Sequence, residues 1–365
     1  SGVIAADGSL VLRLYYDRET LRVTFDAGEG GTLTDEAEKT FRYGQTFSVT
    51  DPTRPDYHFI GWYLPEGGQF NAQTVTASMT LTARWGAQPV DFTVEHYYMD
   101  TTGTMPSAAN ETDRTSEEVD TDIEVGTLKK SGLSEAFTCV KVKVSGVYGV
   151  ENDTEFTDLS ATVRAAKGMT VKLYYDRARC DLRFETNGGT LPEGSGETEQ
   201  VYFGARVRLS ALPQPVKAGY VFHGWHTDAA CENAFAGGTM PVGGLTLYAK
   251  WEAGQNTAYK VEHYLQNADG SYPDAASQTE NLTGATGAAV EAVVQTTTGY
   301  HEDMENESAV KSGTIAADGS LVLRVYYVRD TYTLTFKNAG EDDFVSTLRW
   351  GERITAPALT VTKPG

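Results

Sequence analysis

Apolar and polar residues alternate with a period of two in many short stretches of this chain. The clearest stretches are 21–25 (LRVTF), 247–251 (LYAKW) and 321–327 (LVLRVYY). In each, every second residue is apolar or aromatic, as in a strand that buries one face. Asn-Gly at 187–188 and Asp-Gly at 269–270 stand between such stretches and suit tight hairpins. The pattern predicts a mainly β structure with little helix.

The chain also repeats itself. Residues 1–18 read SGVIAADGSLVLRLYYDR, residues 312–329 read SGTIAADGSLVLRVYYVR, and a looser copy, KGMTVKLYYDR, occupies 167–177. A different pattern starts at 21 and again at 181, with a glycine-rich turn, a Gly-Trp pair and a closing Trp. Two patterns that return in alternation predict a tandem array of small modules.

We call the two repeat types A and B. The sequence predicts six segments in order: the C-terminal hairpin of an A module (1–18), a B module (19–87), an A module (88–177), a B module (178–254), an A module (255–330) and the N-terminal half of a B module (331–365). Because both ends fall inside a module, we expect the natural protein to be longer on both sides. The first complete A module is longer than the second by a loop or hairpin near 136–158.

Composition narrows the function. Among 365 residues, 50 are acidic and 30 basic, so the formal net charge is −20. This charge argues against nucleic acid and anionic membranes as partners. No apolar run is long enough to span a membrane, and the three cysteines are an odd number, so they cannot form a disulfide framework. A Cys180–Cys231 disulfide and free thiols are both left open.

Four tryptophans are expected in the B cores, since each lies in a motif that both B modules share: Trp62, Trp85, Trp225 and Trp251. A buried tryptophan removes on the order of 150–250 Å² from water, which helps modules of this size to fold. His96 and His263 are equivalent in the A modules, and strand alternation places both on the inward face. No partner for them recurs at matched spacing, so we expect structural histidines.

Other candidate chemistry is sparse. His223 and His226 lie near Cys231, but residues three apart in a strand face opposite sides, which argues against zinc. Acidic clusters at 117–122 and 341–343 lack the spacing of a calcium-binding loop, which favours a solvated acidic face. Bound calcium and Lys–Asn isopeptide bonds are both left open. No phosphate-binding loop, nucleophile elbow or dinucleotide motif occurs. We expect no catalytic residue, no metal and no cofactor.

At this point the motifs carry a resemblance. The second B module, with FETNGGT, YFG, GYVFHGW and TLYAKW, resembles the Listeria–Bacteroides repeat, also called the internalin B-type repeat. The first B module departs from that pattern at the glycine turn and at Asp56, where the family has glycine. The A modules, through VEHY and LYY or VYY, resemble mucin-binding-protein repeats. The resemblance implies β-grasp-like modules in tandem on surface proteins of Gram-positive bacteria.

These observations predict a non-enzymatic segment of a bacterial cell-surface or secreted adhesin that serves as an extended stalk. Repetition favours a stalk, because length grows with copy number while a catalytic site gains nothing. The alternative is a binding module, in which the A repeats engage mucin glycans or a host or bacterial surface protein. Its candidate contacts are aromatic residues expected to be exposed, namely Tyr97, Tyr98 and Tyr264.

Overall fold

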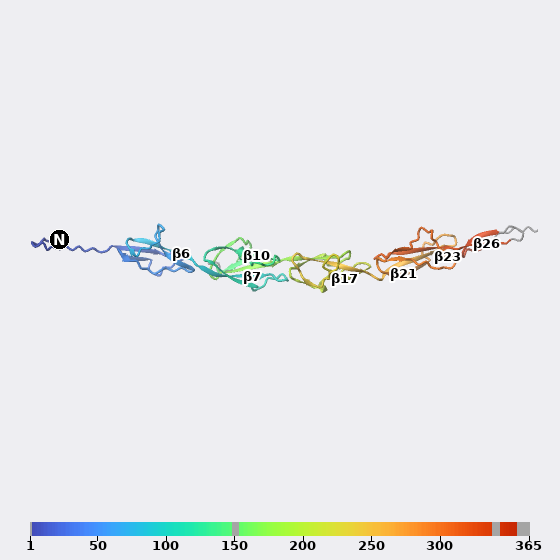
Figure 1. The fold of residues 1–365 in the computed structure, drawn as a ribbon, viewed down its shortest axis with the longest axis horizontal. Coiled ribbons are helices and arrows are strands. Elements are labelled where there is room, and N and C mark those ends of the chain that lie inside the picture. The colour runs from blue at the N-terminus through green and yellow to red at the C-terminus, as the bar shows by residue number, and fades with distance from the viewer. Residues whose placement is uncertain (1, 148–152, 338–343, 356–365) are drawn as a thin grey trace, which may run out of the picture. The chain divides into compact units, whose positions relative to one another are not determined.

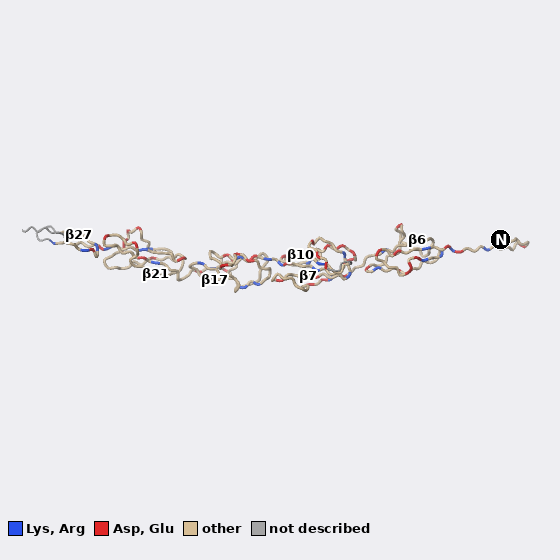
Figure 2. The backbone as a smooth tube through the Cα atoms, turned by 180° about the vertical axis from the view of Figure 1, so that it is seen from behind, with Lys and Arg blue, Asp and Glu red and all other residues tan. Residues whose placement is uncertain are grey.

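The computed structural model describes residues 2–147, 153–337 and 344–355 (Figure 1). The chain divides into two compact units, Ser1–Ala178 and Arg179–Gly365. The described residues form β-strands and two short 3₁₀ helices, and they contain no α-helix. Acidic and basic residues are interspersed along the backbone of both units (Figure 2).

The first B module is a four-stranded sheet in the order β2-β1-β6-β4, with a small β3-β5 ribbon beside it. Its strands are β1 (Thr20–Asp26), β2 (Glu38–Arg42), β3 (Gln45–Thr46), β4 (Tyr57–Tyr63), β5 (Thr74–Val75) and β6 (Met79–Ala87). The central strands β1 and β6 are parallel. Alternate residues of β1, such as Val23 and Phe25, are buried in the module's core with Trp62.

The first A module follows in the same unit as a five-stranded sheet, β11-β10-β13-β7-β8, with a β12-β9 ribbon. Its elements are β7 (Pro89–Tyr98), β8 (Glu111–Glu118), β9 (Asp122–Glu124), the 3₁₀ helix η1 (Val125–Leu128), β10 (Phe137–Ser145), β11 (Thr154–Phe156), β12 (Thr162–Arg164) and β13 (Thr170–Arg177). Strands β7 and β13 are parallel. The β10–β11 hairpin lies where the sequence suggested an extra loop or hairpin.

The second B module repeats the first in the order β15-β14-β19-β17, with a β16-β18 ribbon. Its elements are β14 (Arg179–Glu185), β15 (Thr198–Tyr202), β16 (Arg206–Val207), the 3₁₀ helix η2 (Leu209–Ala211), β17 (Tyr220–His226), β18 (Gly238–Thr239) and β19 (Leu245–Ala253). Leu182, Phe184, Trp225 and Leu247 are buried.

The second A module has the order β21-β20-β25-β23 and a β22-β24 ribbon. Its strands are β20 (Thr257–Leu265), β21 (Gln278–Gly284), β22 (Ala289–Glu291), β23 (Tyr300–Glu302), β24 (Ser312–Thr314) and β25 (Val322–Arg329). A two-stranded hairpin of β26 (Thr331–Phe336) and β27 (Phe344–Arg349) comes after it.

The two repeat types share one topology although their sequence motifs differ. In all four modules the first and last strands pair in parallel at the centre, and the second and third main strands flank them. This arrangement fits the β-grasp-like expectation, without a helix across the sheet. The predicted mainly β array of small modules in tandem is therefore confirmed. No helix in the described ranges has the length and apolar character needed to span a membrane.

The N-terminal segment, residues 2–18, differs from the expected structure. The sequence predicts a hairpin there, but the segment contains only a turn around Asp7 and Gly8 and no strand. Leu14 is 77% exposed, whereas the equivalent Val325 in strand β25 is fully buried. Strand β25 is held by β20 and β23, and no described segment offers such partners to residues 2–18. A strand needs neighbours to satisfy its backbone groups, so a strand pattern alone does not produce one.

Candidate functional site

Both A modules contain a buried histidine–tyrosine pair at the centre of the sheet. In the first, His96 Nδ1 lies 3.0 Å from the Tyr175 hydroxyl, and the backbone N–H of Lys130 donates to the same hydroxyl oxygen at 2.9 Å. His96 is 1% and Tyr175 2% exposed. Strands β7 and β13 place the pair, because the two residues lie on the inward face of adjacent parallel strands.

The second A module repeats this geometry. His263 Nδ1 lies 2.9 Å from the Tyr327 hydroxyl, which accepts a 2.8 Å hydrogen bond from the Gln295 backbone N–H. The tyrosine partner does not recur at matched spacing along the chain. The two residues are 79 apart in one module and 64 apart in the other, because the first contains the longer β10–β11 hairpin. The repeated LYY and VYY motifs were the signal that could have revealed the tyrosine.

Charged groups cover the outer side of each histidine. Asp113 Oδ2 lies 3.2 Å from His96 Nε2, and Lys130 Nζ lies 3.0 Å from that same carboxylate oxygen. The hydrogen bond from Lys130 is the main cause that lowers the pKa of Asp113. Glu280 takes the corresponding place beside His263, at 3.5 Å.

Hydrogen-bond roles follow from this network. An ionised Asp113 can only accept, which assigns a ring proton to Nε2 of His96; in the neutral tautomer Nδ1 then accepts from the Tyr175 hydroxyl, whose oxygen accepts from Lys130 N–H. Burial raises the pKa of Tyr175 to about 12, so it stays a hydroxyl at neutral pH. Since histidine and tyrosine are both sealed from solvent, the pair can fasten the loop at Lys130 to strand β13 but cannot meet a substrate.

The candidate ligand contacts of the A modules are not exposed, which corrects the expectation. Tyr97 and Tyr264 are each 8% exposed. Tyr97 stacks on Tyr174 at 4.8 Å between ring centroids, and Tyr264 stacks on Tyr326 at 4.7 Å. Adjacent parallel strands bring these rings face to face, so each tyrosine covers the other.

Tyr98 is also packed inward. Its ring lies 5.1 Å from that of Tyr175, and its hydroxyl is buried without a hydrogen-bond partner among the described residues. A buried phenol oxygen is not accessible to a ligand. None of the three tyrosines therefore presents its ring and hydroxyl freely to solvent.

The tryptophans occupy two kinds of position in the B modules. Trp62 and Trp225 are 6% and 2% exposed. Trp85 and Trp251 are half-buried, and each closes its module by a hydrogen bond from the indole N–H to a backbone carbonyl in the glycine-rich turn after the first strand. The acceptors are Ala27 O and Thr186 O, both at 2.8 Å.

The zinc and disulfide candidates do not come together. His226 is buried, while His223 is exposed and lies 3.0 Å from Glu252. All three cysteines, which lie within the described residues, are free thiols. No group of three or more His, Cys, Asp or Glu side chains in the described ranges is arranged to hold a metal ion. The acidic cluster 341–343 lies outside the described residues.

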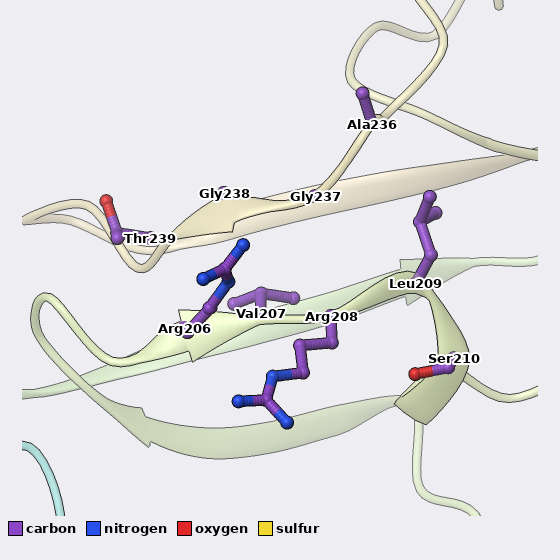
Figure 3. A pocket seen from close by; sticks show the side chains of 9 residues that line it. All are labelled: Arg206, Val207, Arg208, Leu209, Ser210, Ala236, Gly237, Gly238 and Thr239. Carbon is purple, nitrogen blue, oxygen red and sulfur yellow. The ribbon is translucent and has the colours of Figure 1, made fainter.

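An open groove of about 870 Å³ runs along the β16-β18 ribbon of the second B module. Arg206 and Arg208 are exposed at its edge. On the opposite side, Gly237 and Gly238 have no side chains to cover the backbone. Arg206 reaches toward β18, whereas Arg208 extends to the other side of β16 (Figure 3). Because the two guanidinium groups diverge and no buried polar side chain lines the groove, we assign no ligand to it.

Comparison with known proteins supports the repeat assignment of the B modules. Residues 22–84 and 181–250 match the family model of the Listeria-Bacteroides repeat domain. Two proteins of Evansella cellulosilytica are similar in sequence, one named as a candidate membrane protein and one as a candidate Gly-rich membrane protein. They are 26% and 28% identical over 67% and 63% of this chain. The chain spans 34% and 24% of their lengths.

Solved structures give weaker likenesses. The pilus adhesin SpaC of Lactobacillus rhamnosus GG aligns over 71% of this chain and 46% of its own, at 9% identity and a TM-score of 0.17. The TIE protein of Bacillus anthracis aligns over 86% of this chain and 51% of its own, at 8% identity and a TM-score of 0.15. Such low scores carry no conclusion about fold or function.

Proposed function

We propose that this chain is a non-enzymatic repeat segment of a bacterial cell-surface or secreted adhesin, and that it acts as an extended spacer. The observation that carries the proposal is the alternation of two module types, the B type matching the Listeria-Bacteroides repeat domain twice. The recurrent polar residues support it as well. The pairs His96–Tyr175 and His263–Tyr327 are buried, and each tyrosine hydroxyl also accepts from a backbone N–H, which suits a structural role.

The spacer role predicts the dimensions of the chain in solution. A compact protein of 365 residues has a radius of gyration of about 21 Å. Modules held in a row should give a clearly larger value by small-angle X-ray scattering at low protein concentration. A value near the compact estimate would mean that the modules fold back on one another, and the spacer proposal would have to be abandoned.

Mucin-binding-like A modules that engage a mucin glycan or a host or bacterial surface protein are the second proposal from the sequence. The covered positions of Tyr97, Tyr98 and Tyr264 mean that a ligand would have to use other residues. A glycan array probed with the whole chain separates the two proposals, because a spacer should give no signal above a tagged control protein. Gram-positive wall attachment and secretion are both compatible with the spacer role.

A further inference from the structure

Each B module meets the A module of its own unit through the same two backbone hydrogen bonds. In the first unit, Gln88 N donates to Asp56 O at 3.1 Å, and Val119 N donates to Gln88 O at 3.0 Å. In the second unit, Gly254 N donates to Gly219 O at 2.8 Å, and Thr286 N donates to Gly254 O at 2.9 Å. One linker residue is thus bonded on one side to its B module and on the other to its A module.

The side chains that complete this joint differ between the units. In the first, Asp56 has a φ of 61° and lies 3.8 Å from Lys167 Nζ, and the Tyr57 hydroxyl donates to Asp120. An open cavity of about 620 Å³ remains between the two modules there. Side chains of both modules therefore contribute to the joint without filling it.

In the second unit the joint is closed by the backbone of Ala317 and the side chain of Thr286. Gly219 has a φ of 72°, and a Cβ added there would lie 2.6 Å from Ala317 O and 2.8 Å from Thr286 Oγ1. Thr286 Oγ1 also donates to Gly219 O at 2.7 Å and is 7% exposed as a residue. The glycine leaves the space into which the A module's turn fits.

The two A modules can be aligned at this turn by their hydrogen bonds. Asp120 N donates to Ala165 O, and Gly287 N donates to Ile315 O, both at 2.9 Å. Counting two residues onward places Lys167 and Ala317 at equivalent positions. Asp56 therefore faces a lysine in one joint, whereas Gly219 faces the backbone of an alanine in the other.

We propose that the end of each B module is a docking surface matched to the A module that follows it, and that Gly219 is the residue that decides the fit in the second unit. Steric fit outweighs charge here, because Lys167 is 75% exposed and such ion pairs contribute little. The two joints respond differently to exchange of these residues: aspartate at 219 would place its Cβ 2.6 Å from the Ala317 carbonyl oxygen, while glycine at 56 would lose only the weak ion pair. The inference deepens the proposed spacer role, because docked joints would limit bending within each unit.

Distances between spin labels in the full chain test the proposal. Labels are attached to genetically encoded keto amino acids at exposed Ser210 and Ser308, so that the three native cysteines remain. The parent should give a narrow distance distribution, and Gly219→Asp should broaden it. In the first unit, labels at Ser48 and Ser131 should stay narrowly distributed after Asp56→Gly.

Two controls separate docking from folding and from backbone strain. Labels at Glu199 and Ser210, both in the second B module, report whether that module stays folded in Gly219→Asp. If the B module does not stay folded in Gly219→Asp, the Gly219→Ala variant is used in its place, since the single methyl group of alanine contacts the same Ala317 carbonyl. Gly287→Ala adds a side chain at a φ of 78° with nothing within 4 Å, so it introduces backbone strain without a clash. The distance distribution between Ser210 and Ser308 should stay narrow in this variant.

Two outcomes would overturn the proposal. A broad distribution between Ser210 and Ser308 in the parent would show that the modules are not docked. An unchanged narrow distribution in both Gly219 variants would show that fit at this residue does not matter. Either result concerns the joint alone, whereas the scattering experiment tests the spacer role, so the two can fail separately.

Discussion

The indole of Trp251 fills the space that any side chain at Gly189 would need. A Cβ added to Gly189 would lie 2.4 Å from the Trp251 ring carbon Cζ2. The same indole donates to Thr186 O, 65 residues earlier in the chain. The closing tryptophan of the second B module is therefore a clamp on the turn that follows its first strand.

Replacing Gly189 with alanine should destabilise the second B module. The added methyl group would force the ring away from the turn and weaken the bond to Thr186, at a cost on the order of 1–3 kcal/mol for overpacking. Urea denaturation followed by tryptophan fluorescence measures the effect. Gly196→Ala is the matched control, because its Cβ would make only ordinary contacts of 3.4 Å or more. Equal midpoints for the two variants would contradict the clamp.

Replacing Trp225 with alanine should remove much of the stability of the same module. Its side chain is 2% exposed and packs 5.1 Å from the ring of Phe184. Large-to-small changes of buried aromatic residues cost roughly 3–5 kcal/mol. Differential scanning calorimetry should show the second B module melting well below its parent temperature, while Tyr43→Ala, at a site 52% exposed, should change little. A Trp225 variant that melts like the parent would place this residue outside the core.

Removing the buried tyrosine hydroxyls should cost stability in both A modules. In Tyr175→Phe the Lys130 N–H and the His96 ring lose a partner, and in Tyr327→Phe the Gln295 N–H does. A buried donor left unsatisfied costs about 1–3 kcal/mol. The control is Tyr174→Phe, which keeps the ring that stacks on Tyr97. Hydrogen exchange at the Lys130 amide should accelerate only in Tyr175→Phe, and a protected amide would count against the network.

The first A module should lose a stabilising contribution in acid. The hydrogen bonds from Lys130 and His96 lower the pKa of Asp113 from its ordinary value of 3.8. A carboxyl with a lowered folded-state pKa stabilises the fold above the unfolded value, and the contribution disappears as pH falls through the folded value. The stability difference between the parent and Asp113→Asn should therefore be present at pH 7 and shrink below pH about 4. Because Asp113 is half exposed, the difference should be small and should decrease in high salt. A difference that persists at the lowest pH would mean that the charge of Asp113 is not its source.

Within the four complete modules, the sequence by itself determined the mainly β character, the repetition and the inward position of the histidines. These properties depend on local spacing, because a period of two assigns each residue to one face of a strand. The burial of His96 and His263 could be read in this way. The placement of Tyr97 and Tyr264 could not, because each is covered by a tyrosine on a neighbouring parallel strand.

Only the tertiary structure decided which distant residues meet. Strand pairing between the ends of a module joins His96 to Tyr175 and Trp251 to the turn at Thr186, and neither pairing follows from spacing along the chain. It also showed that A and B modules share one strand order, which their different motifs conceal. Residues 2–18 show the converse: a near-copy of a buried strand stays outside any sheet where no described segment pairs with it. The physical reason is the same throughout, since hydrogen bonds and burial belong to pairs of segments rather than to a segment alone.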